Sequence, residues 1–290
     1  MQFKTLALYI GVALAVAAPA AMAAPSEVKL CGSHETAPTS VEQALGNKIA
    51  AQRAAGSSSS LSKSSAAAAA VSANIPVYYH LITDGSSSGR ISTSAINSQI
   101  SILNDNFSGT GLSFYLASTD TTVNSDWFNN VNQGTSQERA MKSALRKGGS
   151  NALNVYTVSF GSSGLLGYAT FPWNYRSNPT NDGIVLDWNT YPGGPITNYQ
   201  EGKTLVHEIG HWVGLYHVFQ GGCSGSGDYV DDTPPQSTVT RGCPSSQDSC
   251  SGGGVDSIHS HMDYSYDSCR YLWTNGQIAR MGAAVDAYRI

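Results

Sequence analysis

The stretch HEIGHWVGLYH, residues 207–217, decides how this chain is interpreted. His207 and His211 are four residues apart, so on an α-helix they project from one face and can hold one metal ion. Glu208 stands beside the first ligand, where a carboxylate can take a proton from water, which is the general-base role in zinc peptide hydrolysis. The pattern predicts a helix that carries a zinc site.

His217 can supply a third ligand only if the chain bends. In a continued helix it would lie about 15 Å along the axis from His207 and point away from the metal. Gly214 stands where a positive φ would let the backbone leave the helix and return His217 to the ion. Three neutral imidazoles leave a fourth position open, which predicts one catalytic zinc ion rather than a structural one. The four other histidines lack this spacing and are predicted to be non-ligands: His34, His80, His259 and His261.

The N-terminus has the layout of a secretory signal. Lys4 precedes an apolar stretch at residues 6–18, and Ala21-Met22-Ala23 is a small-x-small cleavage site. The apolar stretch is shorter than the roughly 20 residues of a membrane anchor, which is the alternative. Residues 1–23 are therefore predicted to be a removed signal, and the mature protein to be secreted, extracellular and outside the membrane.

Composition gives no sign of a nucleic-acid partner. Charged residues make up 12% of the chain and the formal net charge is -4, whereas a phosphate-binding surface needs clustered Lys and Arg. We expect a monomer that acts on protein or peptide substrates and binds no nucleic acid.

The five cysteines are placed unevenly, with Cys31 alone near the start and the others in one late segment: Cys223, Cys243, Cys250 and Cys269. In an oxidising compartment the late four are expected to form two disulfides, for which the sequence alone allows three connectivities. A four-cysteine zinc site fits less well, because structural zinc sites use cysteine pairs about two to four residues apart.

A composition shift divides the chain. Residues 56–73 are almost wholly Ser and Ala and predict a linker. Residues 24–72 are therefore interpreted as a pro-segment with this linker, the alternative being a disordered tail, and residues 73–290 as the catalytic domain.

Hydrophobic patterning within the catalytic domain predicts an α/β layer structure. Strands are expected at residues 75–82, 112–117, 153–160, 164–170 and 183–186. Helices are expected at residues 91–107, 136–147 and 201–214, and after an N-cap at Thr274.

HExxHxxGxxH followed by a methionine turn is the metzincin pattern, and SHMDYS at residues 260–265 would be that turn. More narrowly, the chain resembles the pappalysin family of secreted metzincins. The resemblance rests on six blocks in order: GLLGYATFPW (164–173), TLVHEIGHWVGLYHVFQGGC (204–223), GDYVDDTP (227–234), GCPSSQDSC (242–250), MDYSYDSC (262–269) and NGQIARM (275–281). It implies a twisted, mostly parallel sheet with a backing helix, and an active-site helix above a loop-rich, disulfide-bonded lower subdomain.

The resemblance also implies roles for single residues. Met262 would form the hydrophobic base beneath the zinc, and Tyr264 would stabilise the oxyanion of the tetrahedral intermediate, the alternatives being ordinary packing roles. The implied disulfides are Cys223–Cys250 and Cys243–Cys269. An extended substrate would pair with an edge strand that contains Leu165, Leu166, Gly167, Tyr168 and Ala169.

Cys31, in KLCG at residues 29–32, resembles the pro-segment cysteine that keeps related enzymes latent. Its thiolate would take the fourth zinc position until the segment is cut away, and a stray free thiol is the alternative. Some family members bind calcium, and Asp228, Asp231 and Asp232 offer oxygen ligands, with loop or capping roles as the alternative. His261 departs from the family, which often has asparagine before the methionine.

Two rival functions make different demands on the sequence. A catalytically silent secreted binding module on the same scaffold should have lost the base or a ligand, and a structural zinc should have a fourth protein ligand in the mature form. Both the base and the ligands are intact. The sequence therefore favours a latent zinc endopeptidase that hydrolyses peptide bonds of extracellular proteins by means of a metal-activated water.

Overall fold

The computed structural model describes residues 28–34, 36–57 and 71–290. The predicted signal at residues 1–23 and most of the predicted linker lie outside these residues.

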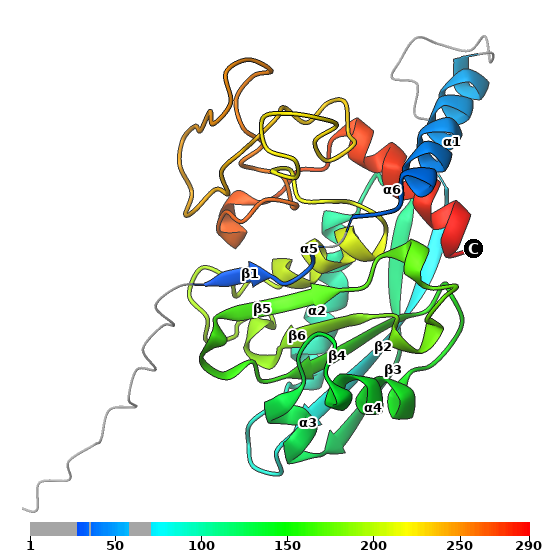
Figure 1. The fold of residues 1–290 in the computed structure, drawn as a ribbon. Helices are drawn as coiled ribbons and strands as arrows, with labels where there is room; N and C mark the ends of the chain where they lie inside the picture. Colours follow the sequence, from blue (N-terminus) through cyan, green and yellow to red (C-terminus); the bar gives the residue numbers. More distant parts are fainter. Residues whose placement is uncertain (1–27, 35, 58–70) are drawn as a thin grey trace, which may run out of the picture.

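Six strands form one sheet in the order β1-β5-β6-β4-β2-β3 (Figure 1). Only β5 and β6 pair antiparallel, and all other neighbours are parallel, as predicted for a mostly parallel sheet. The strands are β1 Lys29–Cys31, β2 Ala73–Thr83, β3 Leu112–Val123, β4 Leu153–Val158, β5 Leu165–Ala169 and β6 Ile184–Asp187.

Strand β3 extends beyond the predicted end at residue 117. Its second half, ASTDTTV, is polar, yet it pairs with β2 up to Val123 opposite Thr83. An outer strand with alternate residues in water needs little apolar content. The apolar run that marks a buried strand is therefore missing there.

Helices cover both faces of the sheet. Side chains of α2 and α5 pack on one face in the main hydrophobic cluster, and α3 and α4 pack on the other in a second cluster. The helices are α1 Thr39–Ser57, α2 Thr93–Asn106, α3 Ser125–Asn130, α4 Ser136–Leu145, α5 Lys203–Trp212 and α6 Asn275–Tyr288. Short 3-10 turns lie at Gly161–Ser163, Pro172–Asn174, Pro179–Asn181, Trp188–Thr190 and Asp267–Cys269.

The predicted start of the last helix is confirmed. The Thr274 hydroxyl accepts a hydrogen bond from the Gln277 backbone, while the Gln277 side chain accepts one from the Thr274 backbone. This reciprocal capping box satisfies two backbone donors that a helix start leaves without partners.

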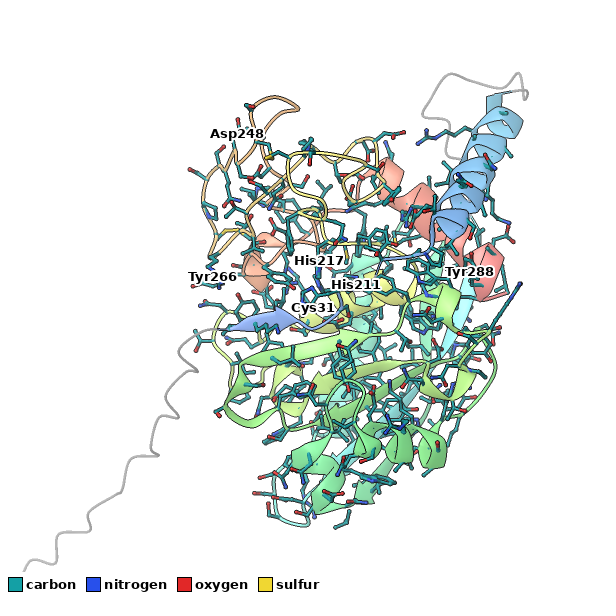
Figure 2. All side chains as sticks on the ribbon, viewed as in Figure 1. Cys31, His211, His217, Asp248, Tyr266 and Tyr288 are labelled. Carbon is teal, nitrogen blue, oxygen red and sulfur yellow. A yellow bond between two sulfur atoms is a disulfide. The ribbon has the colours of Figure 1, made fainter. Side chains whose placement is uncertain are left out.

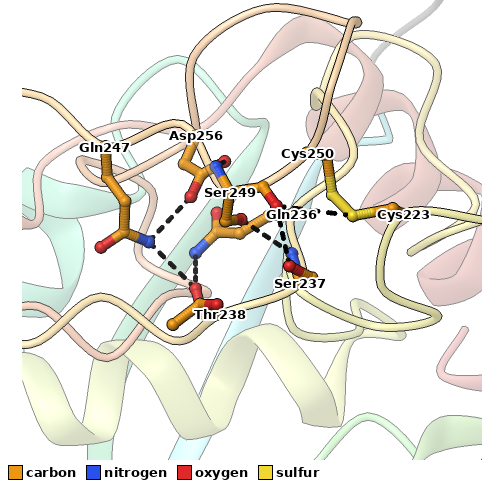
Figure 3. Close-up of a disulfide and its surroundings, with 8 residues drawn as sticks. All are labelled: Cys223, Gln236, Ser237, Thr238, Gln247, Ser249, Cys250 and Asp256. Carbon is orange, nitrogen blue, oxygen red and sulfur yellow. Dashed lines mark hydrogen bonds between the residues drawn. A yellow bond between two sulfur atoms is a disulfide. The ribbon is translucent and has the colours of Figure 1, made fainter.

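Between α5 and α6 the chain forms the loop region at the top of Figure 1. Disulfides join Cys223 to Cys250 and Cys243 to Cys269, which is the pairing that the family resemblance implied. Near the first disulfide, the Asp256 carboxylate accepts hydrogen bonds from Gln247 Nε2 at 2.7 Å and from the Ser249 backbone at 3.1 Å (Figure 3). Covalent links and carboxylates thus hold together a region with little regular structure.

Helix α1 was not predicted. It packs along α6 (Figure 1), and Leu45 is buried in a cluster with Phe171, Trp173 and Tyr216. The alternative of a disordered tail is therefore wrong for residues 36–57. Within the described part of the chain, no helix is long and apolar enough to span a bilayer.

Near the C-terminus, Arg289 ties α5 to the sheet. Its buried guanidinium contacts the Asp182 carboxylate at 2.9 Å and donates to the Trp212 carbonyl at the end of α5. It also lies 3.7 Å from the centre of the Trp212 ring. These contacts satisfy a helix end that would otherwise be buried without partners.

Replacing Arg289 with Met should lower the free energy of unfolding by about 3–5 kcal/mol, because the buried Asp182 carboxylate loses its closest ionic partner and keeps only Arg146, at 3.7 Å, besides neutral donors. Urea unfolding followed by tryptophan fluorescence measures the change. The neighbouring variant Ile290→Ala, at a side chain that is 64% exposed, should change it by less than about 0.5 kcal/mol. Equal effects of the two substitutions would contradict this role.

Candidate metal centre

The predicted bend after α5 is present. The helix ends at Trp212, and Gly214 has a φ of 99°. The Gly214 amide donates to the His211 carbonyl and the Leu215 amide to the Gly210 carbonyl, both at 2.9 Å. Such a left-handed turn favours glycine, and a Cβ here would also lie 2.7 Å from the Ala284 side chain.

The bend brings the three predicted histidines together. His217 Nε2 lies 3.2 Å from His207 Nε2 and 3.1 Å from His211 Nε2, and all three side chains are buried. Burial lowers the pKa of all three imidazoles, to about 4 for His211. They are therefore neutral near pH 7, as metal ligands must be.

Backbone carbonyls fix the tautomers of two of the rings. His207 Nδ1 lies 2.6 Å from the His261 carbonyl, and His211 Nδ1 lies 2.8 Å from the Leu215 carbonyl. A carbonyl only accepts, so we assign the ring proton to Nδ1 and leave Nε2 bare. Bare nitrogens that converge on one point repel each other unless a cation lies between them, and this arrangement fits a metal ion.

Cys31 completes the group. Its Sγ and one nitrogen from each of His207, His211 and His217 all lie within 4.8 Å of one another, and all four residues are buried. Figure 2 shows Cys31, on β1, beside His211 and His217. Three imidazoles and one thiolate form a donor set that suits tetrahedral zinc. In the absence of a cation, burial raises the pKa of the Cys31 thiol, and a bound metal ion would favour the thiolate instead.

Strand β1 holds Cys31 in place by pairing with β5. Lys29 lies opposite Leu165 and Cys31 opposite Gly167, in parallel register. The Lys29 amide donates to the Gly164 carbonyl at 2.8 Å, and the Gly32 amide to the Gly167 carbonyl at 2.9 Å. The predicted substrate edge is therefore covered by the N-terminal segment.

Glu208 contacts the N-terminal segment. Its Oε2 atom is 3.4 Å from Cys31 Sγ and 3.5 Å from Ser33 Oγ, whereas its buried Oε1 atom has no hydrogen-bond partner among the described residues. Burial raises the pKa of Glu208 to about 8, although the contacts with Cys31 and Ser33 oppose the rise. Gly167 makes room for this carboxylate, because a Cβ there would lie 3.1 Å from Oε1.

Met262 and Tyr264 both pack near the group. Met262 is fully buried against α5, where a Cβ on Gly210 would overlap with its sulfur atom. The Tyr264 ring centre is 5.0 Å from that of His217, and its hydroxyl donates to the Cys31 carbonyl at 3.2 Å. Burial raises the pKa of Tyr264, so the hydroxyl keeps its proton and remains a donor.

The other histidines lie outside the four-residue group. His80 bonds to Asp120 at 2.8 Å, and His259 Nδ1 bonds to the Cys269 carbonyl at 2.8 Å. The ring centre of His34 lies 5.9 Å from that of His217. His261 is buried against Trp273, and neither of its ring nitrogens has a hydrogen-bond partner in the part of the chain that the structure describes.

The three aspartates proposed for calcium have protein partners. Asp232 accepts from the Gly276 amide at the start of α6, and Asp231 lies 3.5 Å from Arg53. Asp228 Oδ1 accepts from the Thr233 hydroxyl at 2.7 Å. Calcium binding stays a prediction.

Two residues at the site were missed from the sequence. Ser33 Oγ accepts a hydrogen bond at 2.9 Å from the amide of Ala169, the last residue of β5. Glu42 forms an ion pair with Arg280 at 2.7 Å. Neither belongs to a motif, and the partners of Glu42 are far away in the sequence. For Ser33, the only local sign of a role at the site was the preceding motif KLCG, residues 29–32.

Comparison with known proteins gives consistent matches. A peptidase family described as pregnancy-associated plasma protein-A matches residues 147–286. An extracellular metalloprotease of Sordaria macrospora is 41% identical, with 100% of this chain and 98% of that protein covered. A promirolysin mutant of Tannerella forsythia superposes with a TM-score of 0.66 at 27% identity, covering 89% of this chain and 94% of the other. Mature mirolysin of the same organism, in complex with a cleaved peptide, superposes with a TM-score of 0.62 at 27% identity, covering 76% and 96%.

The metal content of purified protein tests the ligand set. Wild type should hold about one zinc ion per chain, and His217→Ala should bind zinc at least about tenfold more weakly, because one of three histidine ligands is gone. The matched variant His261→Asn should keep its zinc. Inductively coupled plasma mass spectrometry after gel filtration measures both, and zinc loss only in His261→Asn would refute the assignment.

Proposed function

The chain belongs to the pappalysin family of extracellular metalloproteases, and we propose that it is a zinc endopeptidase kept latent by its own N-terminal segment. It is a metalloendopeptidase and acts outside the cell. Under this proposal residues 1–23 are the signal, residues 24–72 the pro-segment with its linker, and residues 73–290 the catalytic domain.

One observation carries the proposal: the convergence of Cys31 with His207, His211 and His217 within 4.8 Å. The three histidines would hold zinc throughout, and Cys31 would hold it only before processing. When bound, zinc would lower the pKa of a coordinated water molecule and polarise the peptide carbonyl.

Glu208 is the proposed general base. In the latent form its Oε2 atom contacts Cys31 and Ser33, so removal of the segment would free this oxygen too. Glu208 then takes the proton of the attacking water and passes it to the leaving amine.

Tyr264 and β5 are the proposed substrate-positioning groups. The Tyr264 hydroxyl now donates to the Cys31 carbonyl, which shows that it can donate to a peptide oxygen beside the metal ligands. After processing it would donate to the oxyanion. Strand β5, freed of β1, would offer its backbone groups to an extended peptide. Protein and peptide substrates therefore fit this site.

Glu208→Gln should lower kcat on casein by about 10²–10⁴-fold with unchanged zinc content, because the amide cannot take a proton. Glu201→Gln is the matched control, since this nearby side chain is 48% exposed and pairs only with Lys203 among the described residues. Initial rates with processed enzymes measure both variants. Full activity of a zinc-loaded Glu208→Gln enzyme would refute the assigned base.

Cys31→Ser should give the full-length chain measurable activity before any cleavage, although β1 still covers β5, because a serine hydroxyl is a far weaker zinc ligand than a thiolate. Lys29→Gln, on the same strand but with an exposed side chain, should stay as latent as wild type. A quenched fluorescent peptide reports activity from the moment of purification, and gel electrophoresis shows whether the chain is still intact. If intact Cys31→Ser were as inactive as wild type, Cys31 would not be the source of latency.

A further inference from the structure

Glu42, on helix α1, is held by charged and polar groups that all belong to the catalytic domain. Its carboxylate accepts from both terminal nitrogens of Arg280, with Nη1 at 2.7 Å and Nη2 at 2.9 Å. The Tyr216 hydroxyl donates to the same carboxylate at 2.7 Å. Glu42 and Arg280 are both buried. This is bidentate carboxylate recognition with a third donor.

The arginine is oriented without the help of α1. Its Nε donates to the Gly214 carbonyl at 2.9 Å, directly after the active-site helix. Its guanidinium lies 5.0 Å from the ring centre of Tyr216 and 5.6 Å from that of Tyr229. A guanidinium fixed at one edge and stacked by two rings keeps its remaining donors aimed at the place where Glu42 now lies.

Removal of the pro-segment would take Glu42 away and leave these donors. A cavity of about 470 Å³ already lies between α1 and the loop region, lined by Glu42, Ile49, Tyr229 and Arg280 among others. Loss of α1 would expose the guanidinium to water, but its donors would stay oriented, so the vacated place suits another carboxylate. Asp228 also lines the cavity: its Oδ1 atom accepts from Thr233, and its buried Oδ2 atom has no hydrogen-bond partner among the described residues.

The N-terminal segment itself leads from the ligand group to this carboxylate site. From Cys31 the chain passes Ser33, bonded to β5 at Ala169, and reaches Ala37, whose amide donates to the Tyr216 hydroxyl at 2.6 Å. Tyr216 directly precedes the ligand His217. A peptide that follows β5 past the metal ligands is therefore led to Arg280.

We infer that Arg280, Tyr216 and Tyr229 form a carboxylate-binding site, which Glu42 fills in the latent chain and an acidic side chain of a peptide substrate fills after processing. The second half of this inference rests on the proposed function. It gives the enzyme a preference for substrates that carry Asp or Glu at one fixed distance from the scissile bond.

The first test uses the full-length Glu42→Ala chain and asks whether a small carboxylate restores what was removed. Propionate corresponds to the whole glutamate side chain from Cβ onward, one carbon more than Glu42→Ala removes, and propionamide is its neutral counterpart. Propionate should raise the thermal unfolding midpoint of Glu42→Ala by about 2–4 °C relative to sodium chloride of equal ionic strength. It should leave the wild-type chain unchanged, because Glu42 already fills the site.

Three comparisons make this test decisive. Propionamide should have no effect, and Glu42→Ala combined with Tyr216→Phe or with Arg280→Met should respond much less to propionate. Lys48 lies on α1, like Glu42, and pairs with Asp286 of α6. Lys48→Ala breaks this pair, and propionate should not raise its unfolding midpoint at all. Equal rescue by propionate and propionamide, or none by either, would overturn the inference. Because the readout is folding, it does not depend on proteolysis.

The second test maps cleavage sites in casein by mass spectrometry after processing. Acidic residues should be enriched at least about threefold at one fixed position in the wild-type profile, and Tyr216→Phe should weaken that enrichment. Cleavage without any acidic enrichment would overturn the substrate part of the inference. Absence of cleavage would instead count against the proposed function, and the propionate result would then decide the carboxylate site alone.

Discussion

The structure depends on three buried imidazoles that converge on one point, with His217 Nε2 3.2 Å from His207 Nε2 and 3.1 Å from His211 Nε2, an arrangement that a bound cation would stabilise. His207 and His211 reach this point because α5 is straight, and His217 reaches it because Gly214 turns the chain back. The carbonyls of His261 and Leu215 orient two of the rings, so the loop region has to fold correctly before the ligands are aligned. The disulfides and the buried Met262 then support the site indirectly, by holding that loop region against α5.

The N-terminal segment is fixed at the same histidine group. It places a sulfur atom at the ligand group, pairs with β5 and anchors a helix through Glu42, so three separate contacts hold it in place. The first two engage groups that the proposed catalysis needs, the metal ligands and the sheet edge, and Cys31 and Ser33 also contact Glu208. Latency and catalysis thus share one set of residues, and no separate inhibitory domain is needed.

The sequence predicted most of this arrangement because the strongest signals were local. The histidine spacing, Gly214 and the Thr274 cap each act within a few residues, and each was found where predicted. Helix α1 was missed because its only large apolar side chains are Val41, Leu45 and Ile49, and because its main polar anchor pairs Glu42 with Arg280, 238 positions away. The end of β3 was missed because an outer strand whose alternate residues face water has few apolar residues to mark it in the sequence. Distant pairing, rather than local preference, decides both elements.

The central claim is that Cys31 and the three histidines bind one zinc ion in the latent chain. X-ray absorption spectroscopy at the zinc edge, on the intact full-length protein, tests it most directly. The account predicts one sulfur at about 2.3 Å and three nitrogens at about 2.0 Å, with the sulfur shell lost after the segment is removed. A zinc shell of nitrogen and oxygen alone in the intact chain would contradict it.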